Sequence, residues 1–413
     1  MKSCILTVGT EILFGQILNT NAKFLSEELN NLGHDVMYHK VVGDNRERLL
    51  KNLKEAFSDC DLVITTGGLG PTQDDLTKET VAEYFHDKLQ IHEPSMNMLK
   101  NSFKTMSIEM TENNLKQAYL PESAQALRNP GGTAPGFFIE KERKMIISLP
   151  GPPSEMKAMF LAGAKPVLES KSHDRIYYTF VNTFGIGESS LETKLLPLIN
   201  GQTDPTIATY ASEGQCYLRV ASKRPTIEEA ESAVEKMLEK INNLIGDYVY
   251  STRGEPIEKV LLDIMLTKNL TLSAAESCTG GGFAATFVGQ KGASGVLDRS
   301  LVTYSNEAKV HELGVSEETL KEFGAVSKET ALEMVRGIKA KSGSDISVSV
   351  TGIAGPEGGT PEKPVGLVYI GIVAFGKERV KEYKFNNRGR EYIRKRSILT
   401  MFNEILRSIN GEM

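Results

Sequence analysis

The sequence has few features that would place the protein outside the cell or in a membrane. Its four cysteines are scattered, and none has the paired spacing of a zinc site or a disulfide framework (Cys4, Cys60, Cys216 and Cys278). Reduced thiols are typical of the cytosol. No apolar run approaches the length that crosses a bilayer, and the opening apolar stretch ends at Gly9, too soon for a signal peptide. We therefore expect a cytoplasmic protein without a membrane partner.

The chain also lacks an excess of positive charge. It has 48 lysines and arginines against 53 aspartates and glutamates, which gives a formal net charge of −5. Because proteins that bind nucleic acid usually present a basic surface, this balance argues against that role. A length of 413 residues, with 40% hydrophobic and 24% charged residues, predicts two or three ordinary globular domains.

A glycine-rich turn near residue 277 is the strongest functional signal. The segment 274–282 (AAESCTGGG) lies between a short apolar run and an apolar-periodic segment, a pattern that predicts a strand, a tight turn and the start of a helix. The first N–H groups of a helix have no partner within it, so such a corner can stabilise developing negative charge. Ser277 lies near the turn and is a candidate nucleophile.

Two further strand ends carry residues that could act with Ser277. One is VTYSNEAK, with Tyr304 and Lys309, and the other is SVTGIAGPEGG, with Thr351. Since the carboxyl ends of strands in an open α/β sheet meet at one edge, these side chains are predicted to lie together. Burial can lower the pKa of a lysine until it serves as a base, and Tyr304 could relay the proton. The alternative base is His311, in a Ser-His arrangement.

With these motifs the last part of the chain resembles the CinA C-terminal domain family, over roughly residues 255–410. The segments AESCTGG, VTYSNEAK, TGIAGPEGG followed by KPVG, and an arginine-rich terminal helix carry the resemblance. That family comprises nicotinamide mononucleotide (NMN) amidases, described as Ser/Lys amidohydrolases, and no cofactor is expected. The resemblance implies that Ser277 is the nucleophile and Lys309 its base, with support from Tyr304 and Thr351. It also implies substrate contacts, including an arginine for the phosphate, from Gly280, Gly281, Gly352, Ala354, Gly355, Arg390 and Arg394.

Cys278, next to Ser277, is the rival nucleophile, because amidases also use cysteine. A catalytic cysteine usually has a cationic neighbour that lowers its pKa, and His311 is the only histidine of this region. Neighbouring residues in a tight turn tend to point apart. We therefore expect Cys278 to pack in the core while Ser277 faces the pocket.

The first part of the chain alternates apolar strands with helical patterns, which predicts a doubly wound, mostly parallel α/β sheet. Its third strand runs into the loop GGLGPTQDD, residues 67–75. Glycines at a strand end let main-chain N–H groups meet phosphate oxygens, and adjacent carboxylates could hold a divalent cation there. Asp44, at another strand end, could join Asp74 and Asp75. The alternative is that these aspartates cap the helices that follow.

Four segments of this part resemble the MoaB/MogA-like molybdopterin-binding fold in its CinA form, over roughly residues 1–168: GTEIL, TTGGLGPTQDD, NPGGTAPG and LPGPPSEM. In CinA proteins this domain is associated with metal-dependent hydrolysis of ADP-ribose to AMP and ribose 5-phosphate. The resemblance implies a phosphate cradle formed by Gly67, Gly68, Gly70 and Thr72. It implies acidic ligands for Mg, Mn or Co, with K as a further candidate ion, from Asp44, Asp74 and Asp75. Since molybdopterin enzymes share the fold, handling of a pterin or another nucleotide stays open.

The middle region, about residues 172–250, combines short strands with a long amphipathic helix and resembles the KH-like α+β module of CinA proteins. A KH domain clamps nucleic acid with a GXXG loop, which Gly185-Ile186-Gly187 does not reproduce. We expect a connector or a dimer element. The predicted domains are residues 1–170, 171–252 and 253–413, with a hinge at 251–256.

Together these parts predict a bifunctional hydrolase of pyridine-nucleotide (NAD) salvage, acting as a homodimer on small-molecule nucleotides. The C-terminal domain would deamidate NMN, and the N-terminal domain would hydrolyse ADP-ribose. A competence- or DNA-damage-related binding or scaffold protein, with degenerate pockets, is the alternative. The complete Ser277, Tyr304, Lys309 and Thr351 set argues against degeneracy of the C-terminal site.

Overall fold

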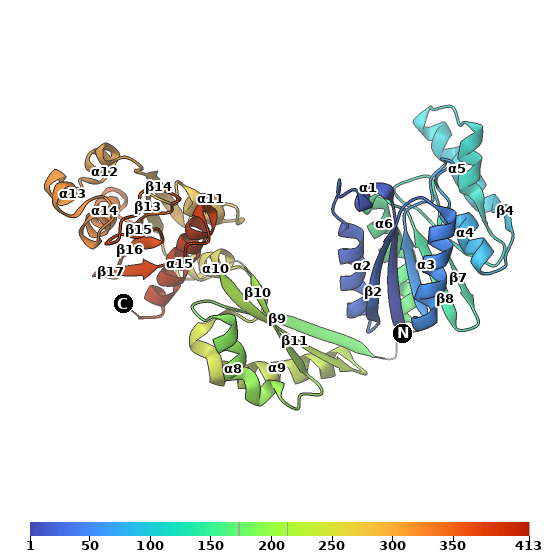
Figure 1. Cartoon of the computed structure of the whole chain (residues 1–413), viewed down its shortest axis with the longest axis horizontal. Coiled ribbons are helices and arrows are strands. Elements are labelled where there is room, and N and C mark those ends of the chain that lie inside the picture. The colour runs from blue at the N-terminus through green and yellow to red at the C-terminus, as the bar shows by residue number, and fades with distance from the viewer. Residues whose placement is uncertain (172–173, 213, 413) are drawn as a thin grey trace. The chain divides into compact units, whose positions relative to one another are not determined.

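The structure, a computed structural model, describes residues 1–171, 174–212 and 214–412, which form two compact units (Figure 1). One unit comprises Met1–Tyr177 with Ser222–Ser232, and the other comprises Tyr178–Ala221 with Ala233–Met413. Both are of the α/β type, so the predicted fold class is confirmed. No helix in the described ranges is long and apolar enough to span a bilayer.

The first unit is built around a six-stranded sheet with the order β2-β1-β3-β8-β7-β6. Four strands run parallel: β2 (Asp35–Val42), β1 (Lys2–Val8), β3 (Leu62–Thr66) and β8 (Lys144–Leu149). The remaining two run antiparallel at one edge: β7 (Gly136–Lys141) and β6 (Gln125–Leu127). The sheet is therefore mostly parallel, as predicted.

Helices cover both faces of this sheet, because its buried strands are apolar on both sides. One face packs against α3 (Arg46–Asp59) and α4 (Thr77–Tyr84), and the other against α2 (Thr20–Asn31) and α6 (Pro153–Met159). Strand β1 contributes to both cores, with Cys4 and Leu6 in one and Ile5 in the other. This arrangement is a doubly wound sheet. Shorter helical segments complete it: α1 (Thr10–Leu13), η2 (Phe160–Ala164) and α7 (Lys165–Glu169).

An additional arm lies between β3 and β7, and the sequence did not predict it. It consists of β4 (Leu89–Ile91), α5 (Glu93–Met106), η1 (Glu112–Ala118) and β5 (Tyr119–Pro121). Strands β4 and β5 pair antiparallel. Helix α5 and η1 pack on each other through a small core of Met96, Leu99 and Ala118.

The middle region forms a four-stranded sheet with the order β10-β11-β9-β12, accompanied by two helices. Its elements are β9 (Arg175–Thr183), α8 (Glu188–Ile199), β10 (Thr206–Ser212), β11 (Gln215–Arg224), α9 (Ile227–Ile245), η3 (Gly246–Tyr248) and β12 (Val249–Ser251). This is the predicted α+β module. The expected hinge that follows is bonded to β9: Phe180 accepts from Gly254 N at 2.9 Å, Thr179 Oγ1 donates to Thr252 O at 2.6 Å, and Asn182 Nδ2 donates to Glu255 O at 2.9 Å.

The C-terminal part is organised on a five-stranded sheet with the order β14-β13-β15-β16-β17. The strands β14 (Leu297–Val302), β13 (Leu272–Glu276) and β15 (Ile346–Gly352) are parallel neighbours, so their carboxyl ends lie side by side. The last two strands are antiparallel: β16 (Leu367–Ala374) and β17 (Lys377–Lys384). Strand β16 has a neighbour on each side, as its continuous apolar sequence predicts.

Helices cover this second sheet as well. One core includes residues of α10 (Ile257–Thr267), α11 (Gly282–Val288) and α15 (Arg390–Ile409). The other face packs against α12 (Asn306–Leu313) and α14 (Lys328–Ser342), with α13 (Glu317–Phe323) between them in the chain. Ser327 caps α14 through Thr330 N, as predicted. A short η4 (Ala293–Gly295) precedes β14.

Candidate active sites

The turn that carries Ser277 joins the end of β13 to α11. Gly280 and Gly281 have φ angles of +60° and +87°, which residues with side chains rarely adopt. The N–H of Ser277 donates to Val350 O on β15 at 3.0 Å, so the turn is fixed to the neighbouring strand. Ser277 itself is 9% exposed. The turn thus holds a serine hydroxyl at the edge of a buried sheet.

Lys309, on α12, is the closest charged partner of this serine. Its Nζ lies 3.1 Å from Ser277 Oγ and also donates to the carbonyl oxygens of Thr303 at 2.8 Å and Tyr304 at 3.2 Å. The residue is 1% exposed, and burial lowers the pKa of its amine because desolvation disfavours the charged form. No carboxylate of the described residues forms an ion pair with it. A lysine without a counter-ion beside a serine hydroxyl can act as a base.

Glu276, which precedes Ser277, is a residue that sequence reasoning missed. It is fully buried, and its carboxylate accepts four hydrogen bonds of 2.8 to 3.0 Å, from Thr279 Oγ1, Phe283 N, Ala284 N and Ser300 Oγ. These bonds tie the Ser277 turn to α11 and to β14. A buried carboxylate is costly unless it is fully hydrogen-bonded. The available signal was an acidic residue at the end of an otherwise apolar strand.

Tyr304 and Thr351, predicted as supporting residues, lie at the neighbouring strand ends. The Tyr304 hydroxyl bonds to Arg390 Nη2 at 2.9 Å rather than to Ser277 or Lys309, and the residue is 60% exposed. Its main-chain carbonyl is the part that contacts Lys309. Thr351 is buried and donates its hydroxyl to Ala325 O at 2.7 Å. In this structure Tyr304 therefore is not bonded as a proton relay, and Thr351 anchors the segment before α14.

Two arginines at the start of α15 connect the glycine-rich segments. Arg390 Nη1 donates to Gly355 O at 2.9 Å, and Arg394 Nη2 donates to Thr279 O at 2.8 Å. The positive end of the helix dipole opposes cations there, so these carbonyl contacts offset part of that cost. Each guanidinium carries five N–H donors and retains some for an anion.

The other predicted glycines of the C-terminal site have mixed roles. Gly355 has a φ of +76° and accepts from Arg390. At Gly352 a Cβ would lie 2.8 Å from Leu367 O on β16, so strand packing explains that glycine. Ala354 is buried in the core. The structure therefore brings Gly280 and Gly355 to the arginines, whereas Gly281 lies against Val302 and Gly352 and Ala354 serve packing.

The structure does not favour either rival residue, Cys278 as the nucleophile or His311 as the base. Cys278 is 6% exposed and packs in the main core, and burial raises the pKa of its thiol to about 12. The expected packing of Cys278 is confirmed. The side chain of His311 is 71% exposed and lies 3.9 Å from Glu307. A Ser277–His311 pair is wrong, because the imidazole lies on the solvent side of α12.

The first unit contains a cavity of about 420 Å³ above the loop that follows β3. Its lining includes the predicted residues Gly67, Gly68, Gly70, Thr72, Asp44, Asp74 and Asp75. Two further carboxylates that the sequence did not predict, Glu11 and Glu155, bring the total in the lining to five. Gly67 has a φ of +105°, and a Cβ there would lie 2.1 Å from Val8 O. The backbone at this strand end therefore requires glycine. We call this cavity the acidic pocket.

The aspartates of the acidic pocket do not cap helices, so the capping alternative is wrong. Asp44 accepts from Thr10 N at 3.1 Å and Thr10 Oγ1 at 2.7 Å, while Asn45 caps α3. Asp75 accepts from Thr72 N at 2.8 Å and Thr72 Oγ1 at 2.6 Å, and α4 has no side-chain cap. Each of these two carboxylates thus uses one oxygen to fix the pocket wall. Asp74 is exposed and lines the same cavity.

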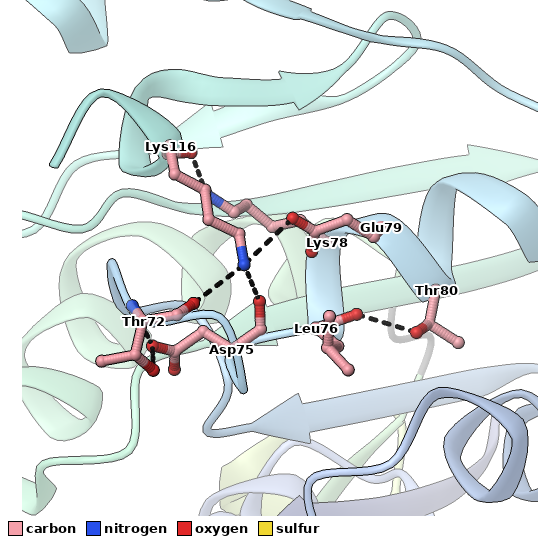
Figure 2. Close-up of polar contacts among 7 residues, drawn as sticks. All are labelled: Thr72, Asp75, Leu76, Lys78, Glu79, Thr80 and Lys116. Carbon is pink, nitrogen blue, oxygen red and sulfur yellow. Dashed lines mark hydrogen bonds and ion pairs between the residues drawn. The ribbon is translucent and has the colours of Figure 1, made fainter. Parts of the chain in front are cut away.

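Two lysines hold the loop from Thr72 to Asp75, as Figure 2 shows. Lys116 Nζ donates to the carbonyls of Thr72 at 2.9 Å and Asp75 at 2.5 Å, and lies 3.4 Å from Glu79. Lys78 is 1% exposed and donates to Lys116 O at 2.5 Å. Burial lowers the pKa of Lys78 to about 8. Sequence reasoning missed both lysines, because they meet this loop only through the unpredicted arm.

Known proteins of a single family match this chain over nearly its full length. A CinA-like protein of Dictyoglomus thermophilum is 49% identical over 386 residues, which cover 94% of this chain and 94% of that protein. The chain belongs to the CinA family. The models that match are "Probable molybdopterin binding domain" at residues 4–170, "Damage-inducible protein CinA KH domain" at 179–251 and "CinA C-terminal domain" at 254–409. The family resemblance given from the sequence is confirmed.

Solved structures of CinA proteins resemble parts of the chain. The competence/damage inducible protein CihA from Agrobacterium tumefaciens is 42% identical, covers 38% of this chain and 97% of its own, and has a TM-score of 0.36. The protein CinA with unknown function from Thermoplasma acidophilum is 37% identical, with coverage of 40% and 99% and a TM-score of 0.38.

The lining of the acidic pocket offers oxygen ligands of the kind that a divalent cation uses. Among residues 1–171, 174–212 and 214–412, no three Asp, Glu, His or Cys side chains are arranged as a ready metal site. Magnesium, however, is commonly held by one or two carboxylates together with waters and substrate phosphates. Carboxylate oxygens around a glycine-rich loop provide ligands of this kind. The buried Gln117, whose Oε1 has no partner, lines the same pocket and adds an unused acceptor.

Proposed function

We propose that the C-terminal domain hydrolyses the amide of NMN, giving nicotinate mononucleotide and ammonia. The observation that carries the proposal is the buried contact of 3.1 Å between Lys309 Nζ and Ser277 Oγ. The family relationship supports a hydrolase, and burial lowers the pKa of Lys309, which favours loss of its proton relative to an exposed lysine. A neutral amine has a lone pair for the hydroxyl proton.

In the proposed reaction Ser277 Oγ attacks the amide carbonyl carbon while Lys309 takes its proton. Main-chain N–H groups of the Ser277 turn stabilise the resulting oxyanion. Lys309 then gives the proton to the leaving nitrogen, the C–N bond breaks, and ammonia departs from an acyl-serine. Water, deprotonated by the same amine, hydrolyses the ester and restores Ser277. Glu276 touches no substrate in this scheme and acts as a positioning residue for the turn.

The arginines at the start of α15 supply the phosphate contact of the proposed substrate. Arg390 and Arg394 lie one turn apart on α15; Arg394 contacts the Ser277 turn and Arg390 contacts Gly355, and a guanidinium fork suits phosphate oxygens. Tyr304, bonded to Arg390, would orient that guanidinium. A substrate with an anionic group at one end and an amide at the other fits this arrangement.

The test is ammonia release from NMN by the purified chain, with nicotinamide as the matched control. Nicotinamide has the same amide but no phosphate, so the proposal expects efficient turnover of NMN only. No ammonia from NMN, with Ser277 and Lys309 unchanged and the protein folded, contradicts the amidase assignment.

We further propose that the acidic pocket hydrolyses ADP-ribose to AMP and ribose 5-phosphate with a divalent ion, Mg, Mn or Co. The support is the combination of a glycine-rich loop with five carboxylates in one cavity. A bound metal would polarise the phosphate and assist attack by water. Asp44, Asp74 and Asp75 are the proposed metal ligands. AMP formation from ADP-ribose, measured with and without added metal, tests this activity.

Both reactions belong to pyridine-nucleotide salvage, and we assign them to the cytoplasm and to a homodimer. Sedimentation equilibrium of the full chain checks the dimer, since a mass near 45 kDa would exclude it.

A further inference from the structure

A second cavity in the first unit has no role in the proposed reactions. It measures about 330 Å³ and lies between the start of α5 and the segment that follows β6. We call it the arm pocket. It shares one lining residue, Thr133, with the acidic pocket, so the two cavities adjoin at that residue. A ligand that occupies both would have to pass Thr133.

The two cavities have opposite chemistry. The acidic pocket is lined by five carboxylates, and no lysine or arginine is among its described lining residues. The arm pocket has no acidic residue among its described lining residues, and its walls combine apolar side chains, among them Pro94, Met98 and Pro130, with polar ones such as Ser95 and Arg128. Carboxylates suit sugar hydroxyls and metal ions, whereas apolar side chains beside a few hydrogen-bonding groups suit a nucleobase.

The arm pocket also has hydrogen-bond donors that the protein leaves available. Arg128 lines it, is exposed, and has no hydrogen bond or ion pair within the described part of the chain. His92 also lines the cavity, and its Nδ1 is engaged by Ser95, 3.3 Å from the main-chain N and 2.7 Å from Oγ. Strand β6 is the edge of its sheet, and an edge strand presents unpaired main-chain groups.

We propose that the arm pocket holds the nucleobase of a nucleotide whose phosphates pass Thr133 to the glycine-rich loop. This inference rests on the proposed ADP-ribose reaction and gives the substrate its orientation. The base stacks between apolar walls and the Arg128 guanidinium. The pyrophosphate lies at the loop, and the terminal ribose lies among the carboxylates. The class of substrate is thus a nucleoside diphosphate with a sugar beyond it.

The absence of tryptophan from the chain allows a direct binding test. Met98→Trp puts a single fluorophore in the wall of the arm pocket. Ile108→Trp puts one on the same arm at a position that is 58% exposed and does not line the cavity. AMP is expected to change the emission of the first variant saturably and to leave the second unchanged. Ribose 5-phosphate, which lacks the base, is expected to change neither.

A second measurement keeps the proposal testable if the new tryptophan fills the cavity. Arg128→Ala should weaken AMP binding by about fivefold in calorimetry and raise KM for ADP-ribose similarly, with kcat unchanged, as expected for the loss of one stacked cation. Ribose 5-phosphate binding should not change. The proposal is overturned if ribose 5-phosphate gives the same fluorescence response as AMP, or if Arg128→Ala leaves both AMP affinity and KM unchanged.

These outcomes separate this inference from the proposed ADP-ribose reaction. AMP binding at the arm pocket without any ADP-ribose turnover would contradict the reaction and support the nucleobase site. If ADP-ribose is hydrolysed and Arg128→Ala changes neither KM nor AMP affinity, the result supports the reaction and contradicts the nucleobase site.

Discussion

The chain contains two glycine-rich turns, each at the end of a parallel strand and each near a fully buried lysine. Lys309 lies beside the Ser277 turn, and Lys78 lies under the loop after β3; both are 1% exposed. Burial lowers the pKa of both amines. Their partners differ, because Lys309 contacts a serine hydroxyl and Lys78 contacts only a main-chain carbonyl. A depressed lysine pKa therefore marks a base only where a nucleophile lies within reach.

The acidic residues of the two turns differ in the same way. Glu276 uses its carboxylate entirely on four internal hydrogen bonds and lines no described cavity. Asp44 and Asp75 each use one oxygen on a threonine and turn toward a cavity. The first turn thus offers a serine and a base, and the second offers carboxylate oxygens. Under the proposed functions, one backbone device would serve covalent chemistry in one domain and metal chemistry in the other.

The largest expected effect comes from removing the serine–lysine pair. Ser277→Ala should lower NMN deamidation at least about a thousandfold, and Lys309→Met about a hundredfold or more, because nucleophile and base act as a unit. Ammonia release measures both. Cys278→Ala is the matched control in the same turn, and its activity should stay near that of the parent chain.

Thiol chemistry gives an independent check on that pair. With a thiol pKa of about 12, Cys278 has almost no thiolate at neutral pH, so iodoacetamide should inhibit slowly if at all. Rapid inactivation that NMN prevents, together with an inactive Cys278→Ser variant, would transfer the nucleophile to the cysteine.

The second prediction is that only the reaction proposed for the first unit depends on a metal ion. EDTA and Asp75→Ala should each reduce ADP-ribose hydrolysis about a hundredfold or more, since the proposed metal stabilises charge on the transferring phosphate. NMN deamidation should change less than about twofold. Because Asp75 also fixes Thr72, Asp74→Asn is the cleaner test: among the described residues Asp74 forms no such bond, so the variant removes only a charge. Full ADP-ribose turnover in EDTA would show that the loop after β3 does not use a metal ion.

The third prediction concerns pH. A base must be unprotonated to accept the serine proton, so kcat/KM for NMN should rise with pH through the pKa of Lys309 and then level off. Because burial lowers that pKa, the rise should end below 10.5, the ordinary value for lysine. Rates across pH 6 to about 10, in buffers of constant ionic strength, measure it. A rise that continues to the ordinary lysine value would show that the buried amine is not the base.

Much of both sheets could be predicted because buried strands are apolar and their order follows from α/β topology. Strand β17 (KERVKEYK) was missed: it lies at an edge with one neighbour, so charged side chains remain in solvent and hide the strand pattern. The arm with α5 was missed as well, and with it Lys116 and the arm pocket. Ser277 and Lys309 were found because strand ends converge in this fold.

Contacts between distant parts of the chain were beyond sequence reasoning. The bond between Arg390 and Tyr304 joins residues 86 apart, and nothing local to either segment indicates it. Glu276 was missed for another reason. An acidic residue at a strand end is normally exposed, and only the converging donors of α11 and β14 explain why this one is buried.

The smallest expected effect is on proteolysis between the middle module and the C-terminal domain. It tests whether the Ser277 site deamidates NMN without the first unit. The segment 251–256, expected as a hinge, is bonded to β9 through Thr179, Phe180 and Asn182. Trypsin should therefore cut after Arg253 only slowly, because cleavage requires local opening of these bonds. Thr179→Val with Asn182→Ala removes two of them and should speed cleavage a few-fold, as gel densitometry over time measures. The released C-terminal fragment should still deamidate NMN, since Ser277, Lys309 and both arginines lie within it. A soluble fragment without activity would show that the turn depends on residues before 254, and the independence of the two sites would be lost.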